Sequence, residues 1–386
     1  AKNHEDVAVV ATPEHYEAVL IDMLANGGGT RPELRRILAA EAFALSAEYD
    51  GAIAGWLRHG AGQEGPLPSS ITLRLDKAQA MRYGENPHQP AAFYVRSGAK
   101  PDFEVLGGKA LSYNNLLDME AAWALACEFP DDAAAVIVKH TQPCGVAVGT
   151  SAHAAYQRAF EADPMSAFGG IVACNRAVDA EMAALMKDVF LEVVVAPDFA
   201  ADALEALRQK KNLRLVRRAY PSEPPPATRY DGLAVRQLSP DLFLAQRNDY
   251  LATETALETG LKVVTKTQPT VEQLQDMAFA WRVAKHLKSN AIVVAREGRT
   301  VGLCGGQTSR VGALEKAVVQ ACDEASGAVL ASDGFFPAID NIQVAAQNRI
   351  SAIIQPGGSI KDPEVIAACD RYDIAMVTTG VREFRH

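Results

Sequence analysis

The sequence lacks the features of several broad protein classes. None of its apolar runs approaches the roughly 20 residues that a membrane-spanning helix needs, and its polar start shows no signal-peptide pattern. Its six cysteines lie far apart without a Cys-x-x-Cys pair, which favours reduced thiols in a cytoplasm over a disulfide framework. The net charge of −9 gives no general basic surface for nucleic acid or anionic membrane. A local basic pocket for a small anion remains compatible with it, because such a pocket needs only a few cations.

Apolar segments dominate the pattern that remains. The chain has 386 residues, 48% of them hydrophobic, which suffices for two or three buried cores. Short apolar runs alternate with helical stretches, and this alternation favours a layered α/β architecture. The expected strands are 133–138, 170–173, 193–196, 262–265, 291–295, 328–331, 352–354 and 374–377, with helices expected over 271–287 and 363–370.

The N-terminal module is small and begins in mid-pattern. A strand is expected over 7–10, then a helix over 12–26 that stops at three glycines, then a second helix from Thr30 to about Tyr49. Residues 60–70 form the clearest linker, and the prolines of 221–226 mark a seam. We expect an incomplete first domain over 1–68 and a second domain over 69–386, with two subdomains that meet near 221–250.

A faint internal sequence repeat suggests two related halves. Residues 135–140 and 291–296 are similar apolar runs, and each is followed by a glycine-containing turn. The segment that begins at Asp163 resembles, more loosely, the segment that begins at Ser332.

Lys139-His140 is the first segment that could carry chemistry. The pair directly follows the apolar run 133–138, and residues 141–145 are expected to turn the chain. Ligands of α/β proteins commonly bind where strands end, His suits general-base chemistry near neutral pH, and Lys can stabilise developing negative charge. The alternative is a solvated strand end without function.

Other segments offer groups for an anion or a flat ring. The loop Arg82-Tyr83-Gly84-Glu85-Asn86-Pro87-His88-Gln89 combines a planar cation, an aromatic face and hydrogen-bonding groups. Polar groups also gather in Lys288-Ser289-Asn290, Gly305-Gly306-Gln307-Thr308-Ser309-Arg310, Ser332-Asp333-Gly334-Phe335-Phe336-Pro337 and Gln355-Pro356-Gly357-Gly358-Ser359-Ile360. The alternatives are polar or glycine turns and, for the paired Phe residues, core positions. Neither glycine-rich segment, 107–109 nor 305–310, fits the phosphate-binding pattern Gly-x-x-x-x-Gly-Lys-[Ser/Thr].

Two further features could be functional but also have explanations without a function. The tail 380–386 would suit an anion if it were docked, although so short a tail is usually frayed. A zinc deaminase site needs His-x-Glu and Pro-Cys-x-x-Cys, but position 147 is Ala where the second Cys belongs. No zinc is therefore expected.

Together these segments resemble a known bifunctional family. They are similar, in order and over residues 71–386, to the transformylase part of the family that joins phosphoribosylaminoimidazolecarboxamide (AICAR) formyltransferase to IMP cyclohydrolase. The shared stretches are Arg-Tyr-Gly-Glu-Asn-Pro-His-Gln, Val-Lys-His-x-x-Pro-Cys-Gly, Asp-Pro-Met-Ser-Ala-Phe-Gly-Gly, Lys-Ser-Asn-Ala-Ile-Val, Gly-Gln-Thr-Ser-Arg, Ser-Asp-Gly-Phe-Phe-Pro, Gln-Pro-Gly-Gly-Ser and Arg-Glu-Phe-Arg-His. The first 60 or so residues resemble the end of the cyclohydrolase domain.

The resemblance implies a fold and an activity. It implies an α/β fold with two cytidine-deaminase-like subdomains, preceded by a C-terminal remnant of an α/β cyclohydrolase domain. It also implies a cytoplasmic homodimer that moves a formyl group from 10-formyltetrahydrofolate, the co-substrate, to the 5-amino group of AICAR in IMP biosynthesis. Cyclohydrolase activity is expected of a full-length parent and not of this chain, and neither nucleic acid nor membrane is an expected partner.

Site residues carry over by position. The resemblance makes His140 the base and Lys139 the transition-state stabiliser. The implied nucleotide contacts are Arg82, Tyr83, His140, Gly169, Glu192, Asn290, Arg310, Phe335 and Arg382, with Arg82 and Arg382 as candidates for the phosphate. The implied folate contacts are Val311, Asp340, Ser359 and Ile360.

Several positions depart from the family pattern. Thr141-Gln142 replaces Ala-Asn, Cys304-Gly305 replaces a Gly-Ala type pair, Gly334 replaces Ala, and Ala338 replaces an aromatic residue. These departures motivate a second hypothesis, a catalytically weak nucleotide-binding homologue. A third, a deaminase-like hydrolase, would require stoichiometric zinc.

Overall fold

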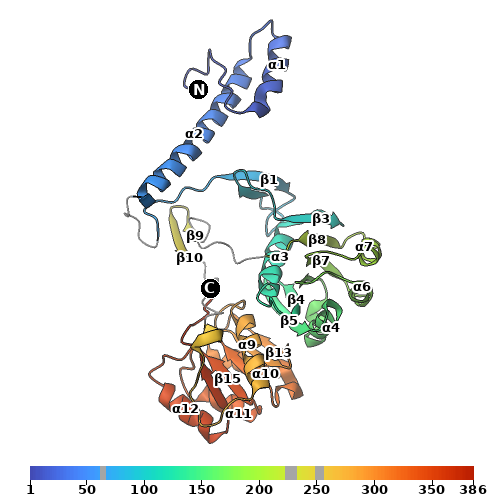
Figure 1. The fold of residues 1–386 in the computed structure, drawn as a ribbon, viewed down its shortest axis with the longest axis vertical. Helices are drawn as coiled ribbons and strands as arrows, with labels where there is room; N and C mark the ends of the chain where they lie inside the picture. Colours follow the sequence, from blue (N-terminus) through green and yellow to red (C-terminus); the bar gives the residue numbers. More distant parts are fainter. Residues whose placement is uncertain (61–66, 222–232, 248–255) are drawn as a thin grey trace. The chain divides into compact units, whose positions relative to one another are not determined.

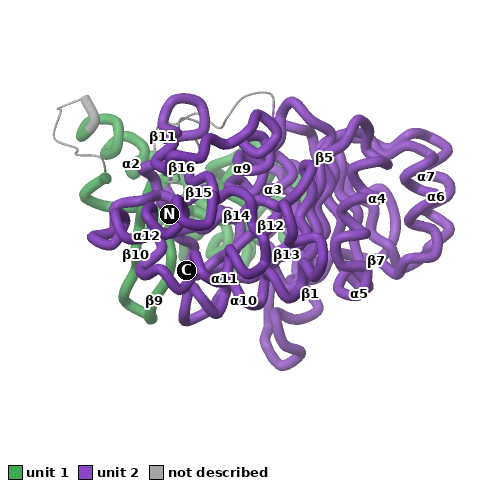
Figure 2. The backbone as a smooth tube through the Cα atoms, turned by 90° about the horizontal axis from the view of Figure 1, so that it is seen from below, with its two compact units in different colours: residues 1–76, 94–99, 235–247 green, residues 77–93, 100–234, 248–386 purple. Residues whose placement is uncertain are grey.

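The computed structural model describes residues 1–60, 67–221, 233–247 and 256–386. These form two compact units (Figure 2). The first unit comprises 1–76, 94–99 and 235–247, and the second comprises 77–93, 100–234 and 248–386. Within the described residues, no helix combines the length and the apolar character needed to cross a bilayer. Residues 61–66 of the expected linker and residues 222–226 of the proline-rich seam lie outside the described residues.

The first unit is built mainly from two helices. They are α1 (Tyr16–Ala25), preceded by the turn η1 (Pro13–His15), and α2 (Pro32–Gly60), which continues well beyond the expected end at Tyr49. Gly27 and Gly28 have φ angles of 62° and 91° and end the first helix as predicted. Most of the hairpin β9 (Leu233–Ser239) and β10 (Leu242–Arg247) also belongs to this unit.

The predicted strand over 7–10 is wrong. The segment has no strand conformation, and the Val7 amide donates to the Asn3 carbonyl in a turn instead. A strand requires backbone partners on a neighbouring segment, and among the described residues none pairs with 7–10.

The second unit contains a twelve-stranded mixed sheet (Figure 1). Its strands are β3 (Phe103–Gly107), β4 (Ala133–Lys139), β5 (Gln142–Gly149), β6 (Gly170–Cys174), β7 (Leu191–Ala196), β8 (Arg214–Arg218), β11 (Lys262–Val263), β12 (Ile292–Arg296), β13 (Arg299–Cys304), β14 (Val329–Ser332), β15 (Ala352–Gln355) and β16 (Ala375–Thr378). Their order is β11-β16-β15-β14-β12-β13-β5-β4-β6-β7-β8-β3. A separate ribbon pairs β1 (Leu75–Met81) with β2 (Ala91–Arg96).

All eight predicted strands of the second unit are confirmed, with shifts at their ends. The prediction that 141–145 turns the chain is wrong beyond Thr141, because β5 already begins at Gln142. Pro143 lies inside β5, opposite Val138 and beside a shift in register. Such irregularities tolerate a residue without an amide hydrogen.

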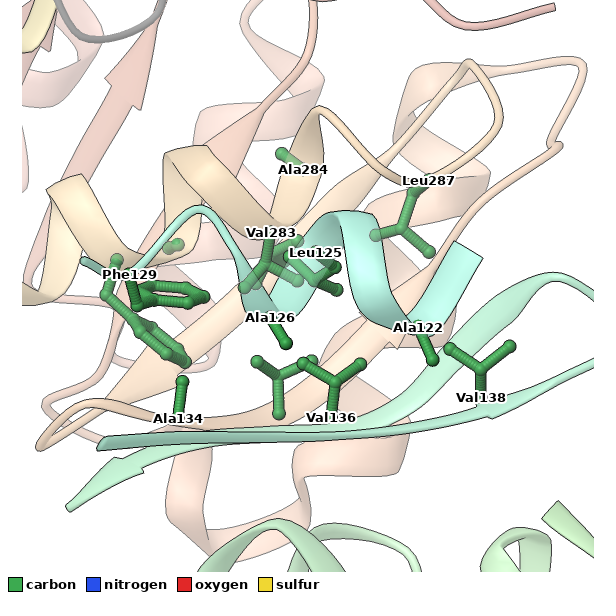
Figure 3. Packing of buried hydrophobic residues seen from close by; sticks show 14 of the residues in the cluster. Ala122, Leu125, Ala126, Phe129, Ala134, Val136, Val138, Val283, Ala284 and Leu287 are labelled. Atoms are coloured by element: carbon green, nitrogen blue, oxygen red, sulfur yellow. The ribbon is translucent and has the colours of Figure 1, made fainter. Parts of the chain in front are cut away.

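Helices cover both faces of the sheet. One face carries α3 (Tyr113–Ala126) and α9 (Val271–Ala284), which pack into a single core over both halves of the sheet. Figure 3 shows Leu125 of α3 and Val283 of α9 above Val136 and Val138 of β4. The opposite face carries α4 (Ala152–Ala162), α6 (Ala180–Met186), α7 (Ala201–Arg208), α10 (Arg310–Ala321), α11 (Asp340–Gln347) and α12 (Asp362–Arg371). Short turns α5 (Pro164–Ala167), η3 (Ala256–Gly260) and η4 (Cys322–Ala325) connect these elements.

The same order of elements occurs twice in this unit. The first half runs α3-β4-β5-α4-β6-α6-β7-α7-β8, and the second runs α9-β12-β13-α10-β14-α11-β15-α12-β16. This repeated order of elements confirms the correspondence predicted between residues 135–140 and 291–296. The looser correspondence is wrong, since Asp163 precedes β6 whereas Ser332 ends β14, the counterpart of β6. An α/β architecture is therefore confirmed, and the likeness of each half to cytidine deaminase stays a prediction.

Candidate active site

The pairing of the strands gathers many loops at one edge of the sheet. β14, β15 and β16 are parallel, so their carboxyl ends lie together, and antiparallel β12 begins there because Ile292 faces Ser332. Following the pairs onward, the same edge holds the end of β13, the start of β5, the end of β4 and the starts of β6 and β7. We call this the site edge.

Most of the predicted site residues belong to segments at the site edge. They are Lys139, His140, Gly169, Glu192, Asn290, Arg310, Val311, Phe335, Asp340, Ser359, Ile360 and Arg382. They come from both halves of the repeat. Each lies at or next to a strand end, on a loop at the site edge, or in the first turn of the helix that follows such a loop. Arg82 and Tyr83 instead follow β1, outside the large sheet.

Lys139 and His140 lie at the tip of the β4–β5 hairpin. Lys139 pairs with Gln142, which leaves His140 and Thr141 as the two turn residues, with φ angles of 54° and 60°. The Lys139 Nζ donates to the Phe168 carbonyl at 2.8 Å, and the His140 side chain is exposed. An ammonium that uses one of its three donors within the described part of the chain therefore lies next in sequence to an accessible imidazole.

A buried polar network surrounds Arg310 at the start of α10. Its Nη1 donates to the Asp333 carboxylate at 2.5 Å and to the Ser332 hydroxyl at 2.8 Å, and its Nη2 donates to Asn290 Oδ1 at 2.7 Å. Asp333 is fully buried, and the Arg310 side chain is 6% exposed. The network therefore fixes two predicted nucleotide contacts, Asn290 and Arg310, relative to each other.

One contact connects the β4–β5 hairpin to the loop that carries Asn290, and a second joins Asn290 to the loop before Arg310. Gln142 Oε1 accepts from the Lys288 amide at 3.4 Å, two residues before Asn290. Asn290 in turn donates to the Gln307 carbonyl at 2.9 Å. The hairpin that carries the predicted base therefore adjoins the loops that carry Asn290 and Arg310.

The C-terminal tail is docked and not frayed. The Ser289 amide donates to the Arg385 carbonyl at 2.9 Å, and the Glu383 amide donates to the Asp333 carbonyl at 3.0 Å. The Phe384 ring lies 4.8 Å from the guanidinium carbon of Arg382 and 6.0 Å from that of Arg310. Backbone hydrogen bonds thus place Arg382 at the site edge, where its charge can attract an anion.

Gly169, directly before β6, and Glu192, near the start of β7, belong to adjacent segments. Gly169 has a φ of 75° and donates its amide to the Phe190 carbonyl at 2.7 Å, while Phe168, just before it, accepts from Lys139. The Glu192 carboxylate forms an ion pair with Arg214. Sequence reasoning missed Arg214, which carries no motif and becomes relevant only through its neighbour on the next strand.

The Arg82 loop is tied to α3. Asn114 Nδ2 donates to the Glu85 carbonyl at 3.4 Å, and the Arg82 guanidinium carbon lies 5.4 Å from the Tyr83 ring centre. Arg82 is exposed. Its described contacts do not join it to Lys139, Asn290 or Phe335, so its placement in the site stays a prediction.

The two Phe residues after β14 point to different surroundings. Phe336 is fully buried in the core, whereas Phe335 is 40% exposed. The core alternative thus holds for Phe336, and Phe335 presents a ring for stacking.

The predicted folate contacts occupy helix starts and a loop. Val311 follows Arg310 in α10, and Asp340 begins α11, where its carboxylate accepts from the Asn341 amide at 2.7 Å. The Ser359 amide donates to Asp362 Oδ2 at 3.1 Å, and the Ile360 side chain is 97% exposed. Ile360 therefore offers an uncovered apolar surface beside the end of β15.

A surface cavity of about 710 Å³ lies at the opposite edge of the sheet. Its lining includes Asp132, Gly149, Arg158 and Arg176 but none of the predicted site residues. In the part of the chain that the structure describes, no three or more His, Cys, Asp or Glu side chains are grouped as a metal site would require. All six cysteines are free thiols.

Comparison with known proteins identifies relatives along the entire chain. A family model described as AICARFT/IMPCHase bienzyme matches residues 1–320. A protein named bifunctional purine biosynthesis protein PurH from Desulfitobacterium hafniense (strain DSM 10664 / DCB-2) is 48% identical over 395 residues, which cover 100% of this chain and 74% of the relative. Proteins of the same name from Anoxybacillus flavithermus and Sorangium cellulosum are both 47% identical, again over 100% of this chain and over 74% and 75% of the relatives.

Proposed function

Because the chain belongs to the AICARFT/IMPCHase bienzyme family, we propose that it transfers a formyl group from 10-formyltetrahydrofolate to the 5-amino group of AICAR. The observation that carries the proposal is the Lys139-His140 turn, which adjoins the Asn290–Arg310 network at the site edge. A base, an ammonium and a guanidinium thus come from loops that neighbour one another.

Each group has a chemical task in this reaction. The amine of AICAR is a poor nucleophile because its lone pair is delocalised into the imidazole ring. His140 takes a proton from this amine while the amine nitrogen forms a bond to the formyl carbon. Lys139 stabilises the oxyanion of the tetrahedral intermediate. The bond between that carbon and N10 of the folate then breaks, His140 returns the proton to N10, and formyl-AICAR and tetrahydrofolate leave.

The remaining residues bind the two substrates. Asn290, Arg310 and Phe335 hold the aminoimidazole and its carboxamide, and Glu192 accepts from ribose hydroxyls. Arg82 and Arg382 bind the phosphate, which suits planar cations. Tyr83 and Gly169 complete the nucleotide contacts, while Val311, Asp340, Ser359 and Ile360 contact the folate.

The proposal also covers assembly and location. The chain forms a homodimer with active sites at the subunit interface, and the protein is cytoplasmic. Dilution to monomers should then abolish turnover, and a fully active monomer would refute the interface site. We expect this 386-residue chain to lack cyclohydrolase activity, which an assay of IMP formation from formyl-AICAR tests directly.

One assay separates formyl transfer from the alternative of nucleotide binding alone. The purified chain is mixed with AICAR and 10-formyltetrahydrofolate, and tetrahydrofolate release is followed. Turnover supports the enzyme. Tight binding of AICAR without turnover would instead favour the catalytically weak homologue, which the Thr141-Gln142 and Gly334 departures motivate.

A further inference from the structure

Asp118 on α3 is bound to the turn that carries His140. Its Oδ1 accepts from the Thr141 amide at 2.6 Å. Burial raises the pKa of Asp118 above its ordinary value, while the Thr141 amide, the His140 charge and the His140 amide act in the opposite direction. All three of these groups belong to the turn, so the half-buried carboxylate lies directly against its backbone.

The turn needs support of this kind. His140 and Thr141 both have positive φ angles, 54° and 60°, and neither is the Gly, Asn or Asp that such hairpin turns usually contain. A β-branched Thr in this region is unusual and persists only where its surroundings fix it. The supporting helix is itself rigid, because Ser112 and Asn115 form a capping box at its start and its buried face packs into the core.

The second half of the molecule contains the same device. Asp276 on α9 accepts from the Glu297 amide at 2.8 Å and from the Gly298 amide at 2.7 Å. Glu297 and Gly298 form the β12–β13 turn, with φ angles of 54° and 67°. Helix α9 also begins with a capping box, formed by Thr270 and Gln273. An aspartate that holds the following hairpin turn is thus a repeated structural feature.

Only one of the two copies lies at the proposed site. The turn held by Asp118 carries His140 at the site edge, beside Lys139. The turn held by Asp276 lies at the opposite edge, since β12 begins at the site edge and ends at Arg296. The two aspartates therefore share a structural task but differ in what their turns present.

We propose that Asp118 is a positioning residue that fixes the backbone of His140, so that its imidazole meets the amine of the bound nucleotide. This inference rests on the proposed function. Asp118 acts through the Thr141 amide and does not itself contact substrate. Asp276 is its structural counterpart without a part in the reaction.

The test compares Asp118→Ala with the matched control Asp276→Ala in the full chain. We expect D118A to lower kcat about 10-fold to 100-fold, because small displacements of a reacting group cost that much, while KM for AICAR stays within about threefold. D276A should lower the melting temperature comparably and keep kcat near wild type. Asp118→Asn, which keeps an oxygen that can accept from Thr141, should recover most of kcat and provides a readout if D118A folds poorly.

A second measurement does not depend on turnover. Hydrogen exchange of peptides that cover 139–142 should speed up in D118A, and exchange over 296–299 should speed up in D276A. Unchanged exchange over 139–142, or an equal loss of kcat in D118A and D276A, would overturn the positioning role. A wild-type chain that forms no formyl-AICAR would instead refute the proposed function, whereas wild-type turnover retained in D118A would refute only the role of Asp118.

Discussion

Arg310 and Asp333 form an ion pair from which solvent is almost entirely excluded, with side-chain exposures of 6% and 0%. Asp333 also accepts from the Ala291 amide at 3.1 Å and from the Ser289 hydroxyl. It therefore connects the loop before β12, the start of α10 and, through its carbonyl, the C-terminal tail. The pair organises the predicted nucleotide contacts around one buried charge.

The first half of the repeat shows what this position looks like without the arginine. Asn175, directly after β6, accepts from the Ala134 amide at 2.8 Å just as Asp333, directly after β14, accepts from the Ala291 amide. Residue Ala152 begins α4 where Arg310 begins α10. The amide suffices for the backbone contact, so the negative charge of Asp333 serves the guanidinium.

Asp333→Asn should therefore be strongly destabilising although it is nearly isosteric. It keeps the contact with Ala291 but leaves the buried Arg310 without its counterion, which costs about 3–5 kcal/mol of the free energy of unfolding. Denaturant melts of D333N, Arg310→Met and the double variant measure the coupling between the two side chains. If the losses in free energy of unfolding of the two single variants add up to the loss of the double variant, the two side chains are not coupled.

His140→Ala should abolish most turnover and leave nucleotide binding nearly intact. A general base contributes about 10²-fold to 10⁴-fold to the rate. We expect kcat to fall by that amount, with KM for AICAR changed by less than about threefold. Steady-state kinetics with both substrates checks this, and unchanged turnover would remove His140 from the mechanism.

Acid should destabilise the chain through the His286–Glu128 contact. His286 Nε2 lies 2.8 Å from Glu128 Oε1, while its Nδ1 is buried and has no hydrogen-bond partner among the described residues. Burial lowers the pKa of His286 from 6.5, against the opposing effect of Glu128. Burial also opposes ionisation of Glu128, but His286 and Lys285 outweigh it and lower the pKa of Glu128 from 4.5.

The lowered pKa of His286 and the lowered pKa of Glu128 both make the folded state less stable as pH falls. Between its folded pKa and 6.5, His286 binds fewer protons in the folded state than in the unfolded state, so stability is lost as pH falls below 6.5. Glu128 adds a loss below 4.5. Melting temperatures from pH 7.5 downward should fall in wild type and fall less below 6.5 in His286→Gln. His88→Gln, which removes an exposed imidazole, is the control and should follow wild type.

Seven of the eight strands that sequence patterns predicted are largely buried, and the exception is β11, whose two residues are exposed. β4 and β12 are continuous apolar runs in the middle of the sheet, where helices cover both sides. β1 was missed because its residues are almost all exposed, and β8 was missed because three of its five residues are arginines. Apolar pattern reports burial, and strands held mainly by backbone pairing leave no such signal.

The site was predictable only in part for a similar reason. Lys139 and His140 stood out because polar residues end an apolar run, and Arg310 stood out through its motif. Asp118 gave no signal, since an aspartate inside a helix is ordinary until the hairpin turn 22 residues later is placed against it. The docking of the tail was likewise unpredictable, because it depends on backbone hydrogen bonds with Ser289 and Asp333.

Gly334→Ala should loosen the docked tail. A Cβ on Gly334 would lie 2.5 Å from Phe384 Cε1 and 2.6 Å from Arg310 Nη2, so one of these side chains must move. Overpacking of this kind typically costs about 1–3 kcal/mol. Because Phe384 contacts both Arg310 and Arg382, we expect KM for AICAR to rise several-fold while kcat changes little.

The control for this variant is Gly51→Ala. Gly51 lies inside α2, and a Cβ there would meet nothing within 4 Å. Alanine at such a helix position stabilises by about 0.5–1 kcal/mol, so G51A should leave both kinetic constants unchanged. Kinetics and hydrogen exchange over 380–386 measure the outcome. Slow exchange and an unchanged KM in G334A would mean that the close packing of Phe384 against Gly334 does not hold the tail in place.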